Sequence, residues 1–354
     1  MTPLEAEIRR LIALEGPIPV DQYMRLCLGH PQHGYYMTRD PFGTRGDFTT
    51  APEISQVFGE LIGAWAAAVW QQMGAPEVLH LIELGPGRGT LMADALRATR
   101  SVAAFRAALS VHLVETSPIL RARQQTVLAE AGAPVAWHGA IEDVPAGPAI
   151  AIANEFVDAL AISQLVKDRD GWHPRMVGLK DERLAFVVAP DPVPRLALAD
   201  APAGSVIELR QDGPVSTLAR RIAEHGGAAL MIDYGHARSG FGDTLQAVRN
   251  HQFADPLADP GEADLTAQVD FAALGQTASR SGARVHGPVT QGAFLRRLGI
   301  DQRAARLQQN ATPQQAADVA GALTRLTAPD QMGELFKVLA IAHPALGALP
   351  GFDR

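Results

Sequence analysis

Short apolar runs alternate with amphipathic stretches through the middle of the chain. The runs have the length of strands, and the stretches between them carry apolar residues at helical spacing. This pattern predicts strands at 78–84, 110–115, 135–137 and 149–153, with helices at 90–99 and 118–131. Because strands that alternate with helices form parallel sheets with right-handed crossovers, we expect an α/β protein.

The first 75 residues show a different pattern, in which apolar positions follow helical spacing without intervening strands. We expect helices at 1–15, 21–28 and 53–73. The second and third are separated by a long loop rich in glycine, proline and aromatic residues. Loops of that length are functional or disordered, and the aromatic content favours an ordered one. We interpret residues 1–75 as a helical N-terminal region and lid.

Beyond residue 160 the pattern changes twice. Short alternating segments within about 161–210 predict a β-rich insertion. A buried strand is expected at 227–234, followed by a loop-rich stretch and by helical insertions within about 265–330. The expected organisation is therefore an N-terminal region, 1–75, and one domain, 76–354, that carries these insertions.

Composition excludes several classes of protein. The net charge of -7 is spread along the chain, which argues against nucleic acid as the main partner. No apolar run is long enough to span a membrane. Cys27 is the only cysteine, so neither an internal disulfide nor a cysteine zinc cluster can form. His30 and His33 have no third ligand nearby in sequence, and we expect no metal site.

A strand followed by alternating glycines and a helical run is the most informative segment. Its acid and glycines are Glu83, Gly85, Gly87 and Gly89. A phosphate-binding P-loop needs a lysine after the glycines, and a dinucleotide fingerprint needs a glycine where Thr90 stands. The spacing resembles motif I of class I methyltransferases, which bind S-adenosylmethionine (SAM).

Two further segments are candidates for holding the adenosine of such a cofactor. Glu115 ends the second strand, where an acid can accept hydrogen bonds from both ribose hydroxyls. The alternative is a solvated acid beside Ser117, which is a good helix cap. After the third strand, Ile141 could pack on the adenine and Glu142 could accept from its amine, although a plain surface turn is equally compatible.

Polar residues follow the fourth strand, at the sheet edge where α/β proteins bind ligands. These are Asn154, Glu155 and Asp158. If 156–160 is helical, Glu155 and Asp158 share a face and could hold an acceptor. The alternative is helix capping by Asn154 and a solvated pair of acids.

The N-terminal loop adds two acids to the candidate cofactor residues. Asp47 and Glu53 lie close in sequence to Tyr35, Tyr36 and Phe48. A loop with this mixture of glycine, aromatic and acidic residues suits a cofactor lid, and a packed structural cover is the alternative.

Motif-like segments extend over nearly the whole chain. They are 46–56, 83–90, 114–118, 153–160, 232–235, 264–271 and 332–339. Together, and in this order, they resemble the MidA-like SAM-dependent methyltransferase family. Its mitochondrial members are assembly factors of respiratory complex I.

This resemblance implies a class I methyltransferase fold, an α/β architecture with a Rossmann-like sheet, and SAM as methyl donor. For the mitochondrial members it implies symmetric ω-N dimethylation of an arginine on a complex I subunit. Glu83–Thr90 and Glu115 match the cofactor motif of the family, and Gly46–Gln56 matches its N-terminal signature. One departure is Ala161, where the family pattern has proline.

The expected function is therefore methyl transfer from SAM to an arginine of a protein, with Glu155, Asp158 and Asn154 as catalytic candidates. A SAM-binding assembly chaperone without turnover and a small-molecule methyltransferase are the alternatives. Since no mitochondrial targeting segment is visible in the sequence, we expect a bacterial, cytoplasmic member of the family.

Overall fold

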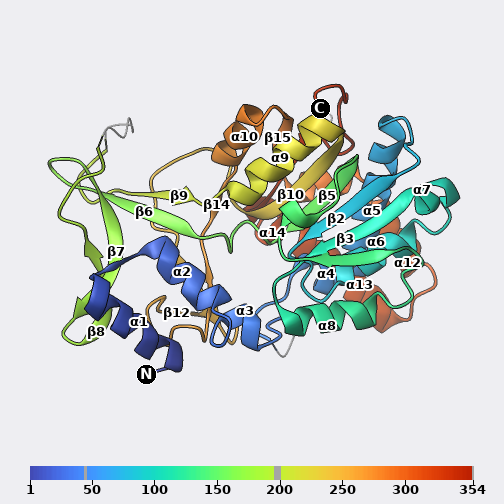
Figure 1. Cartoon of the computed structure of the whole chain (residues 1–354). Coiled ribbons are helices and arrows are strands. Elements are labelled where there is room, and N and C mark those ends of the chain that lie inside the picture. Colours follow the sequence, from blue (N-terminus) through green and yellow to red (C-terminus); the bar gives the residue numbers. More distant parts are fainter. Residues whose placement is uncertain (44–45, 195–200, 353–354) are drawn as a thin grey trace. The chain divides into compact units, whose positions relative to one another are not determined.

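The computed structural model of the chain describes residues 1–43, 46–194 and 201–352 (Figure 1). It contains two compact units. Unit 1 comprises Met1–Phe48, Asp158–Gln211 and Ser239–Gln268, and unit 2 comprises Thr49–Val157, Asp212–Arg238 and Val269–Arg354. The boundary expected at residue 75 stays an interpretation of the sequence, because the compact units divide the chain at other points.

Unit 2 is built on a mixed sheet with five parallel strands at its centre. The parallel strands, in spatial order, are β4 (Val135–His138), β3 (Leu109–Val114), β2 (Leu79–Leu84), β5 (Ala149–Asn154) and β10 (Gly227–His236). The sheet continues with antiparallel β16 (Phe336–Ala342) and β15 (Arg284–Thr290), and β14 (Val269–Asp270) pairs with β10. The alternating pattern of the sequence thus predicted the α/β class correctly.

Helices cover this sheet and make its central strands fully buried. They are α4 (Ala51–Ile54), α5 (Gln56–Gln72), α6 (Thr90–Ala98), α7 (Ala103–Ala108), α8 (Pro118–Val127), the short 3-10 helix η1 (Ile141–Asp143), α9 (Gly213–His225), α10 (Phe271–Arg280), α11 (Gln291–Arg297), α12 (Ile300–Gln308), α13 (Pro313–Thr327) and α14 (Met332–Leu335). All six residues of both β2 and β5 are buried, as expected for parallel strands covered on both faces.

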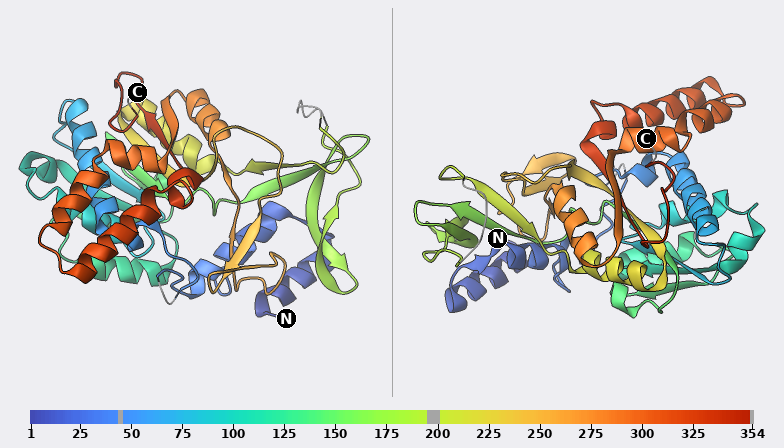
Figure 2. Two further views of the ribbon diagram at one scale, coloured as in Figure 1. Left: turned by 180° about the vertical axis from the view of Figure 1, so that it is seen from behind. Right: turned by 90° about the horizontal axis from the view of Figure 1, so that it is seen from above.

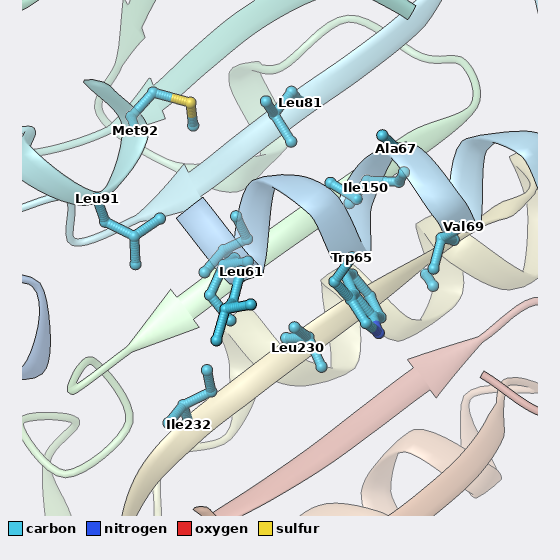
Figure 3. Close-up of a cluster of buried hydrophobic side chains, with 14 of the residues drawn as sticks. Leu61, Trp65, Ala67, Val69, Leu81, Leu91, Met92, Ile150, Leu230 and Ile232 are labelled. Atoms are coloured by element: carbon cyan, nitrogen blue, oxygen red, sulfur yellow. The ribbon is translucent and has the colours of Figure 1, made fainter. Parts of the chain in front are cut away.

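Helix α5 supplies much of the core of unit 2. Its Leu61 and Trp65 lie over the strands at Leu81, Ile150 and Leu230 (Figure 3). The helices α11 to α14, orange to red in Figure 2, gather on the α5 side of the sheet. An ion pair joins α12 to α5, with Arg303 Nε 2.7 Å from Glu60 Oε2.

Unit 1 combines the N-terminal helices with two antiparallel sheets. Its helices are α1 (Pro3–Glu15), α2 (Val20–Gly29) and α3 (Tyr35–Thr38). One sheet has the order β1 (Ile18–Pro19), β7 (Trp172–Lys180), β6 (Ile162–Lys167), β9 (Val206–Arg210), with β8 (Arg183–Val188) paired to β7. The other has the order β12 (Gln252–Ala254), β11 (Gln246–Arg249), β13 (Asp264–Thr266). The β-rich insertion is therefore present, and the N-terminal segment shares a core with it.

Several local expectations were wrong. The helix expected at 53–73 is divided at Ser55, whose extended backbone (φ -158°) separates α4 from α5. Helix α7 was not expected, and the stretch 235–264, expected to be loop-rich, holds strands β11 and β12. Residues 156–160 form turns instead of a helix. Among the residues that the structure describes, no helix is both long and apolar enough to cross a bilayer.

Candidate cofactor and acceptor site

The glycine turn between β2 and α6 has a backbone that only glycine adopts readily. Gly85, Gly87 and Gly89 have φ angles of 63°, 52° and 85°, all in the left-handed region. The N–H of Gly85 donates to the carbonyl of Val114 across 3.0 Å. A Cβ at Gly85 would lie 2.8 Å from Cδ2 of Phe156, so glycine is required there by contact as well as by conformation.

Glu53 reaches this turn from helix α4. Its Oε1 accepts a hydrogen bond from the Thr90 hydroxyl across 2.5 Å. Its Oε2 lies 3.7 Å from Nη1 of Arg88. Arg88 in the turn and Thr90 at the start of α6 thus contact one carboxylate, which joins α4 to the end of the glycine turn.

Glu83, directly before the turn, is buried without a polar partner for one of its oxygens. Its side chain is 3% exposed, and Oε2 forms no hydrogen bond. Burial raises the pKa of this carboxyl to about 8. A buried polar atom without a partner at the end of a strand fits a site that a polar ligand completes.

Glu115 is held at both carboxylate oxygens. Oε1 accepts from the N–H of Ser117 across 2.8 Å, and Oε2 accepts from Nε2 of Gln124 across 3.2 Å. The side chain is 8% exposed, and burial raises its pKa. Ser117 also caps α8, since its hydroxyl accepts from the N–H of Leu120. Glu115 is therefore not the solvated acid of the alternative interpretation.

Gln124 contributes to this arrangement although the sequence analysis did not select it. Its amide contacts the Gly87 carbonyl, the Glu115 carboxylate and the Trp137 indole. A glutamine in the middle of an expected helix carries no sequence signal for such a role. It could have been found only from the packing of α8 against the glycine turn.

The expected adenine segment forms η1. Ile141 is 3% exposed, whereas Glu142 points to solvent. Both line a cavity of about 370 Å³ between η1 and α9, to which Arg220 and Arg221 also contribute. Ile141 is thus buried by the protein and Glu142 is exposed, and their contact with an adenine stays a prediction.

The acceptor candidates Asn154 and Glu155 lie at the carboxyl end of β5. Glu155 has a φ of 51°, which is uncommon for a residue with a side chain and costs conformational energy. Its Oε1 accepts from the N–H of Ala51 across 2.9 Å and from Nδ2 of Asn154 across 3.0 Å. The Oδ1 of Asn154 is buried without a hydrogen-bond partner.

Asp233 on β10, within the motif-like segment 232–235, supports this turn, a role that the sequence analysis did not assign. Its carboxylate is fully buried, and Oδ2 accepts from the N–H of Val157 across 3.0 Å. The N–H of Glu155 donates to the carbonyl of Ile232 across 2.9 Å. These two bonds anchor the turn after β5 to the neighbouring strand, which explains why 156–160 is not helical and why Glu155 and Asp158 share no helical face.

Asp158 and Asp47 belong to unit 1. The main-chain carbonyl of Asp158 accepts from the N–H of Ala267 and from Nη1 of Arg210. The Asp47 carboxylate accepts from the Tyr35 hydroxyl and from the N–H of Asn250, each across 2.6 Å. Asp47 therefore stabilises its own loop, in agreement with the structural alternative for this residue.

The two histidines considered as metal ligands in the sequence analysis, His30 and His33, belong to unit 1. His30 and His33 both face Glu7, with nitrogen–oxygen distances of 3.2 and 3.5 Å. Within the described ranges, no group of three or more histidine, cysteine or acidic side chains is placed to hold a metal ion.

The features of unit 2 fit a cofactor with a cationic amino-acid end and an adenosine. The three glycines of the turn have positive φ, Glu83 and Asn154 present unpaired buried oxygens, and Glu115 presents a fixed carboxylate. The turn after β5, residues 154–157, carries the acceptor candidates Asn154 and Glu155 and is called the acceptor turn below. It lies beside the glycine turn, because Phe156 packs against Gly85. The candidate donor and acceptor residues are thus adjacent on the same sheet edge.

Comparison with known proteins supports this interpretation. Residues 61–289 match the family described as "Putative S-adenosyl-L-methionine-dependent methyltransferase". The chain is 39% identical to the mitochondrial protein arginine methyltransferase NDUFAF7 homolog of Drosophila melanogaster, over 98% of this chain and 86% of that protein. It is 38% identical to protein arginine methyltransferase NDUFAF7 of Mus musculus, over 96% and 84%.

A solved structure shows the same similarity over both units. A protein from Burkholderia thailandensis described as a "likely methyl transferase", bound to S-adenosyl-homocysteine, is 31% identical and has a TM-score of 0.86. The alignment covers 99% of this chain and 94% of that one.

These relatives also correct one expectation. The curated relatives are named as mitochondrial proteins, which contradicts the cytoplasmic location that we expected from the sequence. The family assignment itself is confirmed. The chain belongs to the family of S-adenosyl-L-methionine-dependent methyltransferases, with that cofactor as the methyl donor.

Proposed function

We propose that this protein transfers methyl groups from SAM to the guanidinium group of an arginine on a protein substrate. The observation that carries the proposal is the contact between the glycine turn and the acceptor turn, where a Cβ on Gly85 would meet Phe156. A methyl group held over the first turn would face an acceptor held by the second. The relatives named protein arginine methyltransferases support arginine as that acceptor.

The residues of unit 2 suit this chemistry. When bound, SAM supplies an activated methyl group for an in-line displacement, so the protein mainly has to position the two reactants. Guanidinium is protonated at neutral pH and is a poor nucleophile. A carboxylate such as Glu155 can hold it by charge-assisted hydrogen bonds and direct its electron density toward one nitrogen. That nitrogen loses a proton during or after methylation, so the methylated guanidinium again carries a single positive charge.

Glu155 is the acid that we assign to this role. The Ala51 and Asn154 donors hold its Oε1 in place, which orients the carboxylate at the end of β5. Asn154 is proposed as the residue that fixes Glu155, and its free Oδ1 as a further acceptor. Asp158, which belongs to unit 1, stays a prediction from the sequence.

The cofactor assignments are part of the same proposal. Glu83, Gly85, Gly87, Gly89 and Glu115 are proposed to hold the amino-acid end and the ribose. Ser117, Ile141, Glu142 and Glu53 complete the proposed set, and Asp47, which stabilises its own loop in unit 1, stays a prediction from the sequence. An arginine on a respiratory complex I subunit is the acceptor that the family resemblance implies, and a role in complex I assembly would follow from it.

Transfer of labelled methyl groups tests the function. Purified protein is incubated with methyl-labelled SAM and cell extract, and label is counted separately in protein and in small molecules. We expect label in protein, at arginine after acid hydrolysis. Label confined to small molecules would indicate a small-molecule methyltransferase, and SAM binding without label would indicate an assembly chaperone.

A pair of variants tests the assignment of Glu155. Glu155→Gln should lower turnover at least ~100-fold, the usual effect of losing a catalytic carboxylate, while SAM binding is retained. Glu130→Gln removes an exposed acid of the same type, outside the proposed site, and should leave turnover close to wild type. Normal turnover in Glu155→Gln would refute the assignment.

A further inference from the structure

Gln124 connects the two segments that are proposed to bind SAM. Its Nε2 donates to the Gly87 carbonyl across 2.7 Å and to Oε2 of Glu115 across 3.2 Å. Its Oε1 accepts from the Trp137 indole N–H across 3.0 Å. The side chain is fully buried. One amide group therefore joins the glycine turn, the acid after β3 and the strand β4.

The orientation of this amide is determined by its neighbours. An indole N–H can only donate, so the oxygen of the Gln124 amide must face Trp137. The carbonyl of Gly87 can only accept, and so can an ionised carboxylate at Glu115, so both must face the amide nitrogen. A flipped amide would place like groups against each other at all three contacts.

Gln124 also packs directly against the turn. A Cβ on Gly89 would lie 3.4 Å from Cγ of Gln124 and 3.7 Å from its Cβ. The Cβ and Cγ of Gln124 thus pack against Gly89, while its amide nitrogen donates to the carbonyl of Gly87. Movement of α8 would be transmitted to the turn and to Glu115 together.

The two bonds to Glu115 have a consequence for ligand binding. Ser117 holds Oε1 and Gln124 holds Oε2, so the rotamer of the carboxylate is set before any ligand arrives. Each carboxylate oxygen can accept more than one hydrogen bond. Both oxygens can therefore still accept from a pair of neighbouring hydroxyls, without the entropy cost of ordering the side chain.

We propose that Gln124 is a positioning residue that aligns the Glu115 carboxylate with the glycine turn and so sets the affinity for the ribose of SAM. This inference rests on the proposed cofactor site. It predicts that loss of the Gln124 amide weakens recognition of the ribose hydroxyls specifically, and not methyl transfer itself. The effect should therefore appear in KM for SAM and leave kcat at saturating SAM close to wild type.

Calorimetry with two ligands tests the proposal. Affinities are measured for S-adenosyl-homocysteine and for its 2′-deoxyadenosyl analogue, and their ratio is the discrimination for the 2′-hydroxyl. We expect roughly 10-fold or more in the wild type, since a site built to bond a hydroxyl rejects the analogue without it. In Gln124→Met, which keeps the volume but has no amide, the ratio should fall to about one third or less of that value.

The matched control is Gln125→Met, on the same helix with the same chemical change. Gln125 is exposed, so its replacement should leave the discrimination ratio unchanged. If Gln124→Met does not fold, Gln124→Glu keeps the packing and an acceptor for Trp137 but replaces the donor that faces Glu115. The same loss of discrimination is expected for it.

The possible outcomes separate this inference from the proposed function. Full wild-type discrimination in a folded Gln124 variant would overturn the positioning role. A wild-type protein that binds S-adenosyl-homocysteine but does not distinguish the deoxy analogue would overturn it too. A wild-type protein that binds neither ligand would instead refute the proposed cofactor site.

Discussion

Asp233 Oδ2 accepts a hydrogen bond from the main-chain N–H of Val157 across 3.0 Å, at the point where the chain leaves the acceptor turn. The other oxygen, Oδ1, accepts from the N–H of Tyr234 across 2.9 Å. The carboxylate is fully buried and lies on the strand next to β5. Asp233 thus holds the turn that carries Glu155, although it is distant from it in sequence.

Asp233→Asn should therefore damage the acceptor turn. One carboxylate oxygen becomes an amide nitrogen, which would face a backbone N–H and leave a buried donor unsatisfied. Such a loss typically costs about 1–3 kcal/mol. We expect a lower melting temperature and a fall in kcat, with SAM affinity close to wild type. Unchanged kcat in the folded variant would show that the turn keeps its shape without this bond.

Gly85→Ala should impair cofactor binding. The added Cβ meets Phe156 at 2.8 Å, and a left-handed residue with a side chain costs roughly 1–2 kcal/mol. We expect weaker binding of S-adenosyl-homocysteine by calorimetry, together with a lower melting temperature. Gly321→Ala is the control, because a Cβ there meets nothing within 4 Å. Since Gly321 lies inside α13, alanine should stabilise it by about 0.5–1 kcal/mol.

Glu83 predicts a pH-dependent stability of the cofactor-free protein. Burial raises its pKa from 4.5 to about 8, so the folded state keeps a proton that the unfolded state has lost. Stability must therefore fall as pH rises from about 4.5 to 8. Glu83→Gln removes the carboxyl that must ionise, so the variant should be more stable than wild type at pH 9 by on the order of a few kcal/mol. The difference should vanish near pH 4, as measured by chemical denaturation across pH.

Three histidines on neighbouring strands predict the opposite pH dependence in the acidic range, where the free energy of unfolding should increase with pH. His80 Nδ1 lies 2.9 Å from His112 Nε2, and His112 Nδ1 lies 2.9 Å from His138 Nε2. Burial, followed by the two neighbouring imidazoles and Arg221, lowers the pKa of His112 from 6.5 to about 4. The unfolded state binds a proton in this window and the folded state does not, so stability is lost as pH falls from about 6.5 to 4.

The same denaturation series with His112→Gln tests this prediction. The variant should show a shallower loss of stability between pH 6.5 and 4 than wild type. His225→Gln, at an exposed position on α9, should keep the wild-type slope. A slope that does not change in His112→Gln would mean that other groups dominate acid unfolding. Burial also lowers the pKa of His138, where Asp143 raises it and Arg121 lowers it further.

Local signals explain which features could be predicted. The apolar runs of β2 and β5 and the glycines at 85, 87 and 89 act through their own backbone and neighbours, so the strand–turn–helix was correct within a few residues. Glu115 was correctly placed at a strand end, because the alternation of strands and helices sets that position. Residues 156–160 could not be assigned, since their conformation depends on Asp233 on another strand.

The amino-acid sequence by itself determined the α/β class, the parallel strands and the glycine turn, because hydrophobic periodicity and the need for glycine at positive φ are properties of short segments. Only the tertiary structure decided that the N-terminal helices share a core with the β-rich insertion, and that Gln124 and Asp233 hold the two turns of the site. Those relationships depend on hydrogen bonds and packing between residues far apart in the chain, and no local pattern encodes which distant partner a buried amide or carboxylate will meet.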